Sequence, residues 1–163
     1  MSIVYVIGSM RNPRIPEVGI ALRAAGYDAF EEWYAPGPQA DEEWQKYEQS
    51  RGRAYKDALN GYHAKHVFEF DLFHLDRAHM GVLVMPAGRS AHMELGYLTG
   101  KGKPTFVLFD EEPARYDIMY QFAAAVCFSI DELMLEMDVF RRKDVKVAEQ
   151  TRESRLAPWS SDR

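Results

Sequence analysis

Two acidic residues in this sequence lie in surroundings where carboxylates are rarely found. Glu94 follows a glycine-containing turn near the start of a predicted helix, and Met93, Leu95 and Gly96 flank it. Asp71 falls on the apolar stripe of another predicted helix, at residues 62–79. Carboxylates are seldom buried without a partner, so both acids are candidate functional groups. For Glu94 the alternative is an acid that merely favours the positive end of the helix dipole.

The third chemical feature is the loop after the first predicted strand. A β-branched run at residues 3–7 ends in Gly8-Ser-Met-Arg-Asn12, and a predicted helix follows. A strand, a Gly/Ser turn and a helix in this order present backbone N–H groups to an anion. An arginine in the turn suits phosphate, because its guanidinium donates charge-assisted hydrogen bonds. The loop that begins at Gly8 is therefore a candidate site for a phosphorylated ligand.

The elements that must position these residues alternate between strand and helix. Short apolar or β-branched runs predict strands at residues 3–7, 27–33, 81–85, 105–109 and 126–128. Helices are predicted near residues 116–125 and from about residue 131 to residue 140, the latter with Ser129 as its N-cap. The alternation predicts an α/β fold of the Rossmann-like, doubly wound kind: a five-stranded parallel sheet with helices on both faces. Ligands of such sheets bind beyond the carboxyl ends of the strands, at the switch point. The loop at residues 8–12 and the turn at residues 86–90 both follow strands, so we expect them to face each other.

Length and composition predict one domain with an insertion and a tail. The chain has 163 residues, and the predicted domain covers residues 1–142. The turn-rich and polar segment at residues 35–60 is a helical insertion, with Asp41 as its predicted N-cap and a break at Gly52. It is either a lid over the site or a solvated face anchored by a few aromatic side chains. Residues 143–163 form a charged tail that we expect to be partly disordered.

Charge and residue usage exclude several classes of function. The net charge is −5 and no basic stripe is present, so we expect no nucleic-acid polymer as a partner. Cys127 is the single cysteine, which excludes internal disulfides and a cysteine-based zinc cage. No apolar run is long enough for a membrane helix and no signal peptide is apparent, so we expect a cytoplasmic protein.

A metal site is not expected either. His92-x-Glu94 is similar to part of the zinc deaminase signature, but the paired cysteines that complete that signature are absent. His63 and His66 share a predicted helix face without a third ligand nearby in the sequence. We therefore predict neither a metal ion nor another cofactor.

The loop and the two acids, in this order and at these separations, resemble the nucleoside 2-deoxyribosyltransferase family, including its deoxyribonucleotide N-hydrolase branch. The matching segments are Tyr5-Val-Ile-Gly-Ser-Met-Arg11, the surroundings of Asp71, Glu94-Leu-Gly-Tyr97 and Gly102-Lys-Pro104, within roughly residues 3–128. The resemblance implies a flavodoxin-like fold and a small-molecule nucleoside or nucleotide as the substrate. It also implies a homodimer or larger oligomer, in which a neighbouring subunit completes each site.

The resemblance assigns roles to individual residues. Glu94 would be the nucleophile that attacks the anomeric carbon and forms a glycosyl-enzyme. Asp71 would protonate the departing base, after which water or a second base takes the sugar. Tyr5 would hydrogen-bond to Glu94 and orient it. The residues expected to hold the 5′ end of the sugar, as a phosphate in the hydrolase branch, are Ser9, Arg11 and Asn12.

Two departures from the family pattern concern specificity. Many transferases carry an acid about six positions before the nucleophile, where this chain has Gly88. The hydrolase branch tends to have a phosphate-binding serine in this turn; Ser90 is nearby, and Arg89 is available to an anion too. Both departures favour a nucleotide substrate. The candidates for stacking on the base, or alternatively for packing in the core, are Trp33, Tyr34 and Trp44.

Two other functions are compatible with these patterns. The sequence Gly8-Ser-Met-Arg11 also resembles the FMN phosphate loop of flavin reductase-like proteins. That interpretation leaves Asp71 and Glu94 unexplained, and residues 86–89 lack the aromatic side chain expected of a flavin loop. A non-catalytic sensor that binds a nucleotide would use the same loop, and turnover distinguishes it from an enzyme.

Overall fold

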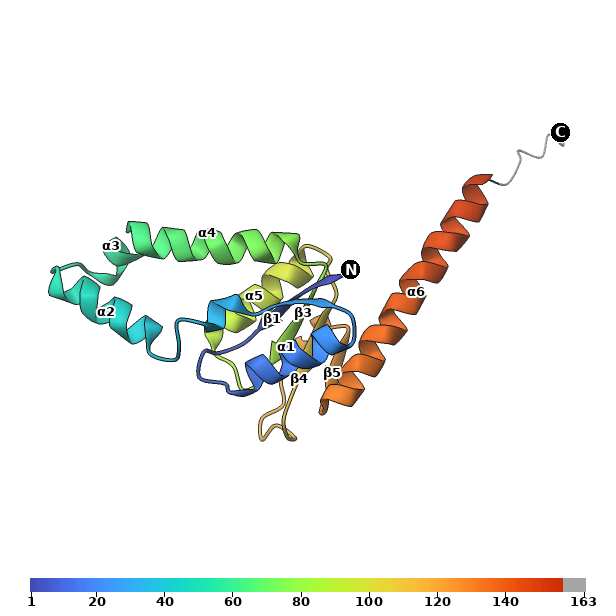
Figure 1. Ribbon diagram of the computed structural model, residues 1–163, viewed down its shortest axis with the longest axis horizontal. Helices are drawn as coiled ribbons and strands as arrows, with labels where there is room; N and C mark the ends of the chain where they lie inside the picture. The colour runs from blue at the N-terminus through green and yellow to red at the C-terminus, as the bar shows by residue number, and fades with distance from the viewer. Residues whose placement is uncertain (157–163) are drawn as a thin grey trace.

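The computed structural model describes residues 1–156, including the side chains of residues 1–143. A central sheet has helices on both sides, and two helical segments extend beyond it in different directions (Figure 1). In chain order the elements are β1 (Ile3–Ile7), α1 (Arg14–Ala24), β2 (Asp28–Phe30), the 3₁₀ turn η1 (Glu32–Tyr34), α2 (Ala40–Ser50), α3 (Tyr55–Leu59), α4 (Tyr62–Arg77), β3 (Met80–Val84), α5 (Arg89–Gly100), β4 (Thr105–Leu108), the 3₁₀ turn η2 (Ile118–Phe122), β5 (Ala125–Cys127) and α6 (Ile130–Leu156).

The five strands form one parallel sheet in the order β2-β1-β3-β4-β5. This is the strand order of flavodoxin-like proteins, and its switch point lies between β1 and β3. The loop after β1 and the turn after β3 meet there, as predicted. The side-chain amide of Asn12 donates to the carbonyl oxygens of Val84 at 3.3 Å and Pro86 at 3.4 Å. The predicted parallel, doubly wound fold is confirmed.

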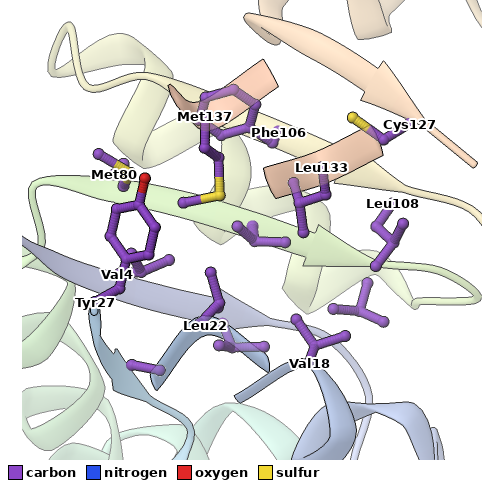
Figure 2. Close-up of a cluster of buried hydrophobic side chains, with 14 of the residues drawn as sticks. Val4, Val18, Leu22, Tyr27, Met80, Phe106, Leu108, Cys127, Leu133 and Met137 are labelled. Atoms are coloured by element: carbon purple, nitrogen blue, oxygen red, sulfur yellow. The ribbon is translucent and has the colours of Figure 1, made fainter. Parts of the chain in front are cut away.

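Alternate residues of the strands face opposite sides of the sheet, and each side has its own buried cluster. Val4 and Val6 of β1 pack in a cluster with α1 and α6, whereas Tyr5 and Ile7 pack in a second cluster with α4 and α5. Figure 2 shows the first cluster, whose labelled members include Val18, Leu22, Phe106, Leu133 and Met137. Strand alternation therefore places Tyr5 on the side of the sheet that α4 and α5 cover.

Gly81 of β3 has no side chain at a point where α5 packs against the sheet. A Cβ atom on Gly81 would lie 2.5 Å from Cδ1 of Leu98 in α5 and 3.1 Å from Cδ1 of Ile7. Gly81 of β3 is also the partner of Tyr5 in the register between β1 and β3. Because residue 81 has no side chain, α5 packs closely against the sheet next to Tyr5.

The insertion at residues 35–60 is helical, as predicted, and we call its two helices, α2 and α3, the arm. The arm and the beginning of α4 extend away from the sheet on one side of the molecule (Figure 1). The break at Gly52 is confirmed, since this glycine has a φ of 70° and lies between the two helices. The prediction of Asp41 as N-cap is wrong, because α2 begins at Ala40 and Asp41 belongs to its first turn.

Two further boundaries differ from the sequence-based ones. The strand predicted at residues 27–33 is confined to Asp28–Phe30, and η1 follows it. The helix predicted near residues 116–125 is a 3₁₀ turn at Ile118–Phe122, and β5 begins at Ala125. Trp33 and Tyr120 nevertheless pack against the core, from irregular backbone.

The last helix, α6, begins as predicted and ends later. Oγ of Ser129 accepts a hydrogen bond from the backbone N–H of Glu132 at 3.1 Å, which confirms the predicted N-cap. The helix was expected to end near residue 140, but it continues to Leu156 because residues 141–156 contain no glycine or proline. The first part of the expected disordered tail is therefore helical, and residues 157–163 lie outside the described residues. No helix in the described part of the chain is long and apolar enough to cross a membrane.

Candidate active site

Glu94 lies on the side of α5 that faces the sheet. Ala91, Leu95 and Leu98 are buried, and with Glu94 they share the spacing of one helix face. The helix begins at Arg89, so Glu94 belongs to its second turn, and the first turn contains no acidic residue. The effect of the helix dipole falls off within the first turn. The alternative role of Glu94, as an acid that merely favours the dipole, is therefore wrong.

Asp71 lies in α4 and is half-buried beside α5 and β1. Leu75 and Ala78, one and two turns further along the same stripe, are buried as predicted. Val67 and Phe70 of that stripe are instead 43% and 41% exposed. The predicted apolar face therefore meets the core only in the C-terminal half of α4, and Asp71 lies where this contact begins.

Tyr5 brings a hydroxyl group from β1 towards the two acids. Its side chain is 1% exposed, yet its hydroxyl group and the buried Oδ1 of Asp71 have no hydrogen-bond partner among the described residues. The two groups are close enough to affect each other's pKa, but they do not complete a hydrogen bond. Burial, and then the charges of Glu94 and Asp71, raise the pKa of Tyr5 far above its usual value. The phenol therefore stays protonated and is a donor available to a carboxylate.

Both carboxyl groups have raised pKa values. Burial raises the pKa of Asp71 to about 6, with Tyr5 opposing the shift. Burial and the charge of Asp71 raise the pKa of Glu94 to about 8. At neutral pH the two carboxyl groups therefore share one proton and titrate as a pair. Such a pair contains a carboxylate and a carboxylic acid side by side, which supplies both a nucleophile and a proton donor.

The loop at residues 8–12 is shaped by its first and last residues. Asn12 is 3% exposed, and its amide ties the loop to the end of β3 as described above. A Cβ atom on Gly8 would lie 2.4 Å from Cδ1 of Ile15, so a larger residue there would displace the Ile15 side chain of α1. Oγ of Ser9 accepts a hydrogen bond from the backbone N–H of Arg11 at 3.2 Å. The loop thus presents the side chains of Ser9 and Arg11, and Asn12 connects it to the neighbouring turn.

The turn at residues 86–90 leads into α5. Gly88 precedes the helix in an extended conformation, and Arg89 and Ser90 are exposed in its first turn. Nδ1 of His92 lies 2.7 Å from the carbonyl oxygen of Gly88, and its Nε2 lies 2.9 Å from the hydroxyl group of Tyr120 in η2. His92 therefore links the start of α5 to η2. Contact of a substrate with residues 88–90 stays a prediction.

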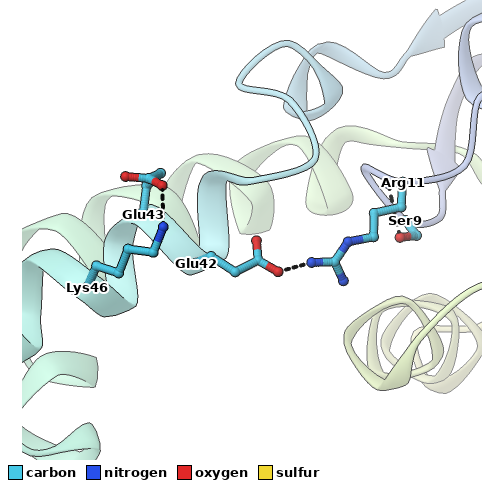
Figure 3. Close-up of polar contacts among 5 residues, drawn as sticks. All are labelled: Ser9, Arg11, Glu42, Glu43 and Lys46. Carbon is cyan, nitrogen blue, oxygen red and sulfur yellow. Dashed lines mark hydrogen bonds and ion pairs between the residues drawn. The ribbon is translucent and has the colours of Figure 1, made fainter.

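Arg11 reaches across to the arm (Figure 3). Its guanidinium group pairs with Oε1 of Glu42 in the first turn of α2, and the two side chains are 66% and 41% exposed. The other carboxylate oxygen of Glu42, Oε2, is buried and has no hydrogen-bond partner among the described residues. The arginine predicted to bind phosphate is therefore paired with a carboxylate of the insertion.

The aromatic candidates for base stacking are engaged in packing. The indole N–H of Trp33 donates to the carbonyl oxygen of Val6 at 2.8 Å, and its ring packs against both buried clusters. Tyr34 meets Trp33 edge to face, with the ring centroids 6.0 Å apart. Trp44 of α2 lies near His63 of α4, with ring centroids 6.3 Å apart. These contacts favour the packing role, and stacking on a base stays a prediction.

The sequence offered little sign of the contacts made by Glu42, His92 and Tyr120. An acidic first turn is ordinary at a helix N-terminus, so nothing singled out Glu42 among its neighbours. His92 and Tyr120 are 28 positions apart and no local pattern connects them. Among the described residues, no group of three or more His, Cys, Asp and Glu side chains is arranged to hold a metal ion.

The comparisons with known proteins agree with the fold. No family model and no curated protein sequence matches this chain. A solved structure of a 2-deoxyribosyltransferase from Bacillus psychrosaccharolyticus matches with a TM-score of 0.57 and 15% identity, over 82% of this chain and 90% of that one. A CMP N-glycosidase from Clostridium botulinum matches with a TM-score of 0.48 and 13% identity, over 84% of this chain and 99% of that one. This chain therefore shares the flavodoxin-like fold of a 2-deoxyribosyltransferase.

Proposed function

We propose that this protein cleaves the N-glycosidic bond of 2-deoxyribonucleosides or their 5′-monophosphates, or exchanges the base of these compounds. The observation that carries the proposal is the placement of the Asp71 and Glu94 carboxyl groups close to each other and to the buried hydroxyl group of Tyr5, beside the switch point of the sheet. Support comes from the resemblance of the sequence motifs and from the fold shared with a 2-deoxyribosyltransferase. The proposed enzyme therefore belongs with the nucleoside 2-deoxyribosyltransferases and the N-glycosidases related to them.

The proposed reaction has two steps. A carboxylate oxygen of Glu94 attacks the anomeric carbon, and the bond between this carbon and the base nitrogen breaks. The electron pair of that bond goes to the base, which takes the proton held by Asp71. Water or a second base then attacks the anomeric carbon of the glycosyl-enzyme, its proton passes to Asp71, and Glu94 leaves as a carboxylate. The phenol of Tyr5 donates to a carboxylate of this pair and orients it.

The location of the shared proton must change when the substrate binds. In the empty site the higher pKa belongs to Glu94, so the proton resides there rather than on Asp71. The positive charge that develops on the sugar in the transition state favours an ionised Glu94. The lone pair of the leaving base, in turn, favours a protonated Asp71. Substrate binding therefore transfers the proton from Glu94 to Asp71.

The proposed active form is a homodimer or a larger oligomer of this chain. Several large apolar side chains on α4 and α5 are exposed near the acids, at Val67, Phe68, Phe70, Phe73 and Met93. Exposed apolar side chains gathered on neighbouring helices are typical of interfaces between subunits. We expect light scattering to give a mass of at least twice that of one chain, and Phe73→Asp to lower it. A monomer at micromolar concentration would contradict this part of the proposal.

The function is tested by chromatography of purified protein incubated with a panel of deoxynucleosides and deoxynucleoside 5′-monophosphates. Each compound is tested with and without a second free base. Release of base without an acceptor identifies a hydrolase, and a new nucleoside formed only with an acceptor identifies a transferase. No product from any compound would contradict the proposal and favour a binding protein. Flavin absorbance of the purified protein would favour the FMN-binding alternative.

A further inference from the structure

Glu42 and Arg11 connect the arm to the loop that follows β1. The loop presents Arg11 towards α2, and Glu42 pairs with it from the first turn of that helix (Figure 3). Among the described side chains, no other ion pair or hydrogen bond joins α2 to residues 8–12. An exposed ion pair of this kind contributes little to folding stability. The pair instead changes the net charge that a ligand meets at this loop.

The pair leaves the loop without a free positive charge at Arg11. A guanidinium group with a carboxylate beside it is nearly neutral at the distance of a ligand, whereas an unpaired arginine attracts phosphate strongly. A dianionic phosphate placed at Arg11 would also lie beside the negative charge of Glu42 and be repelled by it. The insertion thus neutralises the positive charge that Arg11 brings to this loop, and it places a carboxylate where a phosphate would otherwise bind.

The second carboxylate oxygen of Glu42, Oε2, does not take part in the pair with Arg11. Oε1 of Glu42 is engaged with Arg11, and Oε2 is shielded from solvent and has no hydrogen-bond partner among the side chains that the structure describes. A carboxylate oxygen accepts hydrogen bonds and never donates them, so a hydroxyl group is a suitable partner. A phosphate dianion carries only acceptor oxygens at neutral pH and cannot satisfy this oxygen. A sugar 5′-hydroxyl group that reaches the Glu42 carboxylate can donate a hydrogen bond to it, whereas a phosphate dianion cannot.

We propose that Glu42 determines specificity at the 5′ end of the substrate, accepting a free 5′-hydroxyl group and excluding a 5′-phosphate. This inference rests on the proposed function and on the family resemblance, which implies that Ser9, Arg11 and Asn12 hold the 5′ end of the sugar. It selects the unphosphorylated deoxynucleoside as the substrate class. It also gives the insertion a role in recognition, in place of the simple alternatives of a lid and a solvated face.

The neighbouring residue provides a matched control. Glu43 lies next to Glu42 in the first turn of α2, but it pairs with Lys46 at 2.9 Å and is directed away from Arg11 (Figure 3). Glu42→Gln and Glu43→Gln remove the same charge from the same turn of the same helix. Only Glu42→Gln releases Arg11 and removes the acceptor proposed for the 5′-hydroxyl group. A difference between the two variants therefore reports on this contact and not on net charge.

The test measures kcat/KM for a deoxynucleoside that the protein cleaves and for the matching 5′-monophosphate. We expect the wild-type protein to prefer the nucleoside. Glu42→Gln is expected to shift the ratio towards the monophosphate by roughly tenfold or more, the effect of one like charge close to a phosphate. Glu43→Gln is expected to leave the ratio within about twofold of wild type. Equal shifts in both variants, or a wild-type preference for the monophosphate, would overturn the inference.

A second measurement separates this inference from the proposed function. Inorganic phosphate is titrated against each protein, and its binding is followed through the rise in melting temperature. We expect Glu42→Gln to bind phosphate at least about tenfold more tightly than wild type and Glu43→Gln. If the panel yields no product, the proposed function fails while this readout still tests exclusion of phosphate by Glu42. Equal phosphate binding by all three proteins would overturn the inference even if the enzyme is active.

Discussion

The two faces of the sheet are built from alternate residues of the same strands, but they hold different chemistry. On the side of α1 and α6, β1 contributes Val4 and Val6 to a buried hydrophobic cluster. On the side of α4 and α5, β1 contributes Tyr5, which lies beside Asp71 and Glu94. One side is therefore a packing surface, and the other combines packing with buried ionisable groups.

This difference shows how a stable fold accommodates buried ionisable groups. A buried polar atom without a partner costs about 1–3 kcal/mol, and both the Tyr5 hydroxyl and Oδ1 of Asp71 are of this kind. The site face therefore lowers the stability of the fold, and the apolar face offsets that cost. Substitutions of the acids on the site face should therefore lower the activity and can raise the stability. Substitutions on the apolar face should lower the stability and leave the activity of the folded protein unchanged.

The largest expected effect is a loss of activity when Glu94, on the site face, is replaced. Glu94→Gln removes the proposed nucleophile while keeping the shape of the side chain, so we expect turnover to fall by about a thousandfold or more. Base release measured by chromatography checks the rate, and mass spectrometry checks for the glycosyl-enzyme. Retention of more than a few per cent of the activity would show that Glu94 is not the nucleophile.

The neighbouring helix offers a matched comparison for the second acid. Asp71→Asn is expected to lower the rate strongly, because it removes the proposed proton donor. Asp76→Asn changes an acid on the exposed side of α4 that pairs with Lys101 at 2.8 Å, and it should leave the rate nearly unchanged. Similar rates for the two variants would argue against Asp71 as the acid.

The dependence on pH should follow the shared proton. The reaction requires one carboxylate and one carboxylic acid, so we expect kcat/KM to be greatest between about pH 6 and about pH 8. Below this range both acids are protonated and no nucleophile is present. Above it both are ionised and no proton donor remains. A profile that stays flat from pH 5 to pH 9, measured with a protein that stays folded, would contradict the pairing.

On the apolar face the expected effect is on stability alone. Leu133 is fully buried between α6 and the sheet, so Leu133→Ala should lower the free energy of unfolding by about 2–5 kcal/mol. The kcat of the folded protein should be unchanged, because Leu133 lies across the sheet from both acids. Denaturant unfolding and kinetics below the melting temperature check the two effects. A large fall in kcat would show that the two faces are not independent.

The smallest expected effect is an increase in the free energy of unfolding at high pH when Glu94 is replaced by glutamine. The pKa of Glu94 is about 8 in the folded protein and 4.5 without the protein environment, so folding favours its protonated form. Its contribution to stability is thus fully present below pH 4.5 and is lost as the pH rises through about 8. Glu94→Gln should therefore be about 1–3 kcal/mol more stable than wild type at pH 9 and equal to it at pH 4. Lower stability of this variant at pH 9 would show that the Glu94 carboxylate is stabilised rather than destabilised by its surroundings.

Much of the fold was predictable because its signals are local. The β-branched run at Ile3–Ile7 and the apolar run before the Pro86 turn predicted two strands whose following loops face each other, and the two strands are neighbours in the sheet. Asp71 and Glu94 were identifiable because an acid with apolar neighbours at helical spacing is unusual. The predictions failed where a local signal was ambiguous, as for the strand that ended before Trp33 and for the helix that continued past residue 140.

The sequence by itself therefore determined the elements, their order and the two acids, since periodicity and residue type depend only on neighbours along the chain. The tertiary structure alone decided which distant side chains meet. It paired Arg11 with Glu42, 31 positions away, and it set the Tyr5 hydroxyl beside two acids from two different helices. These contacts depend on where the arm and the helices cross the sheet. That placement results from the packing of whole elements and has no counterpart in any short stretch of sequence.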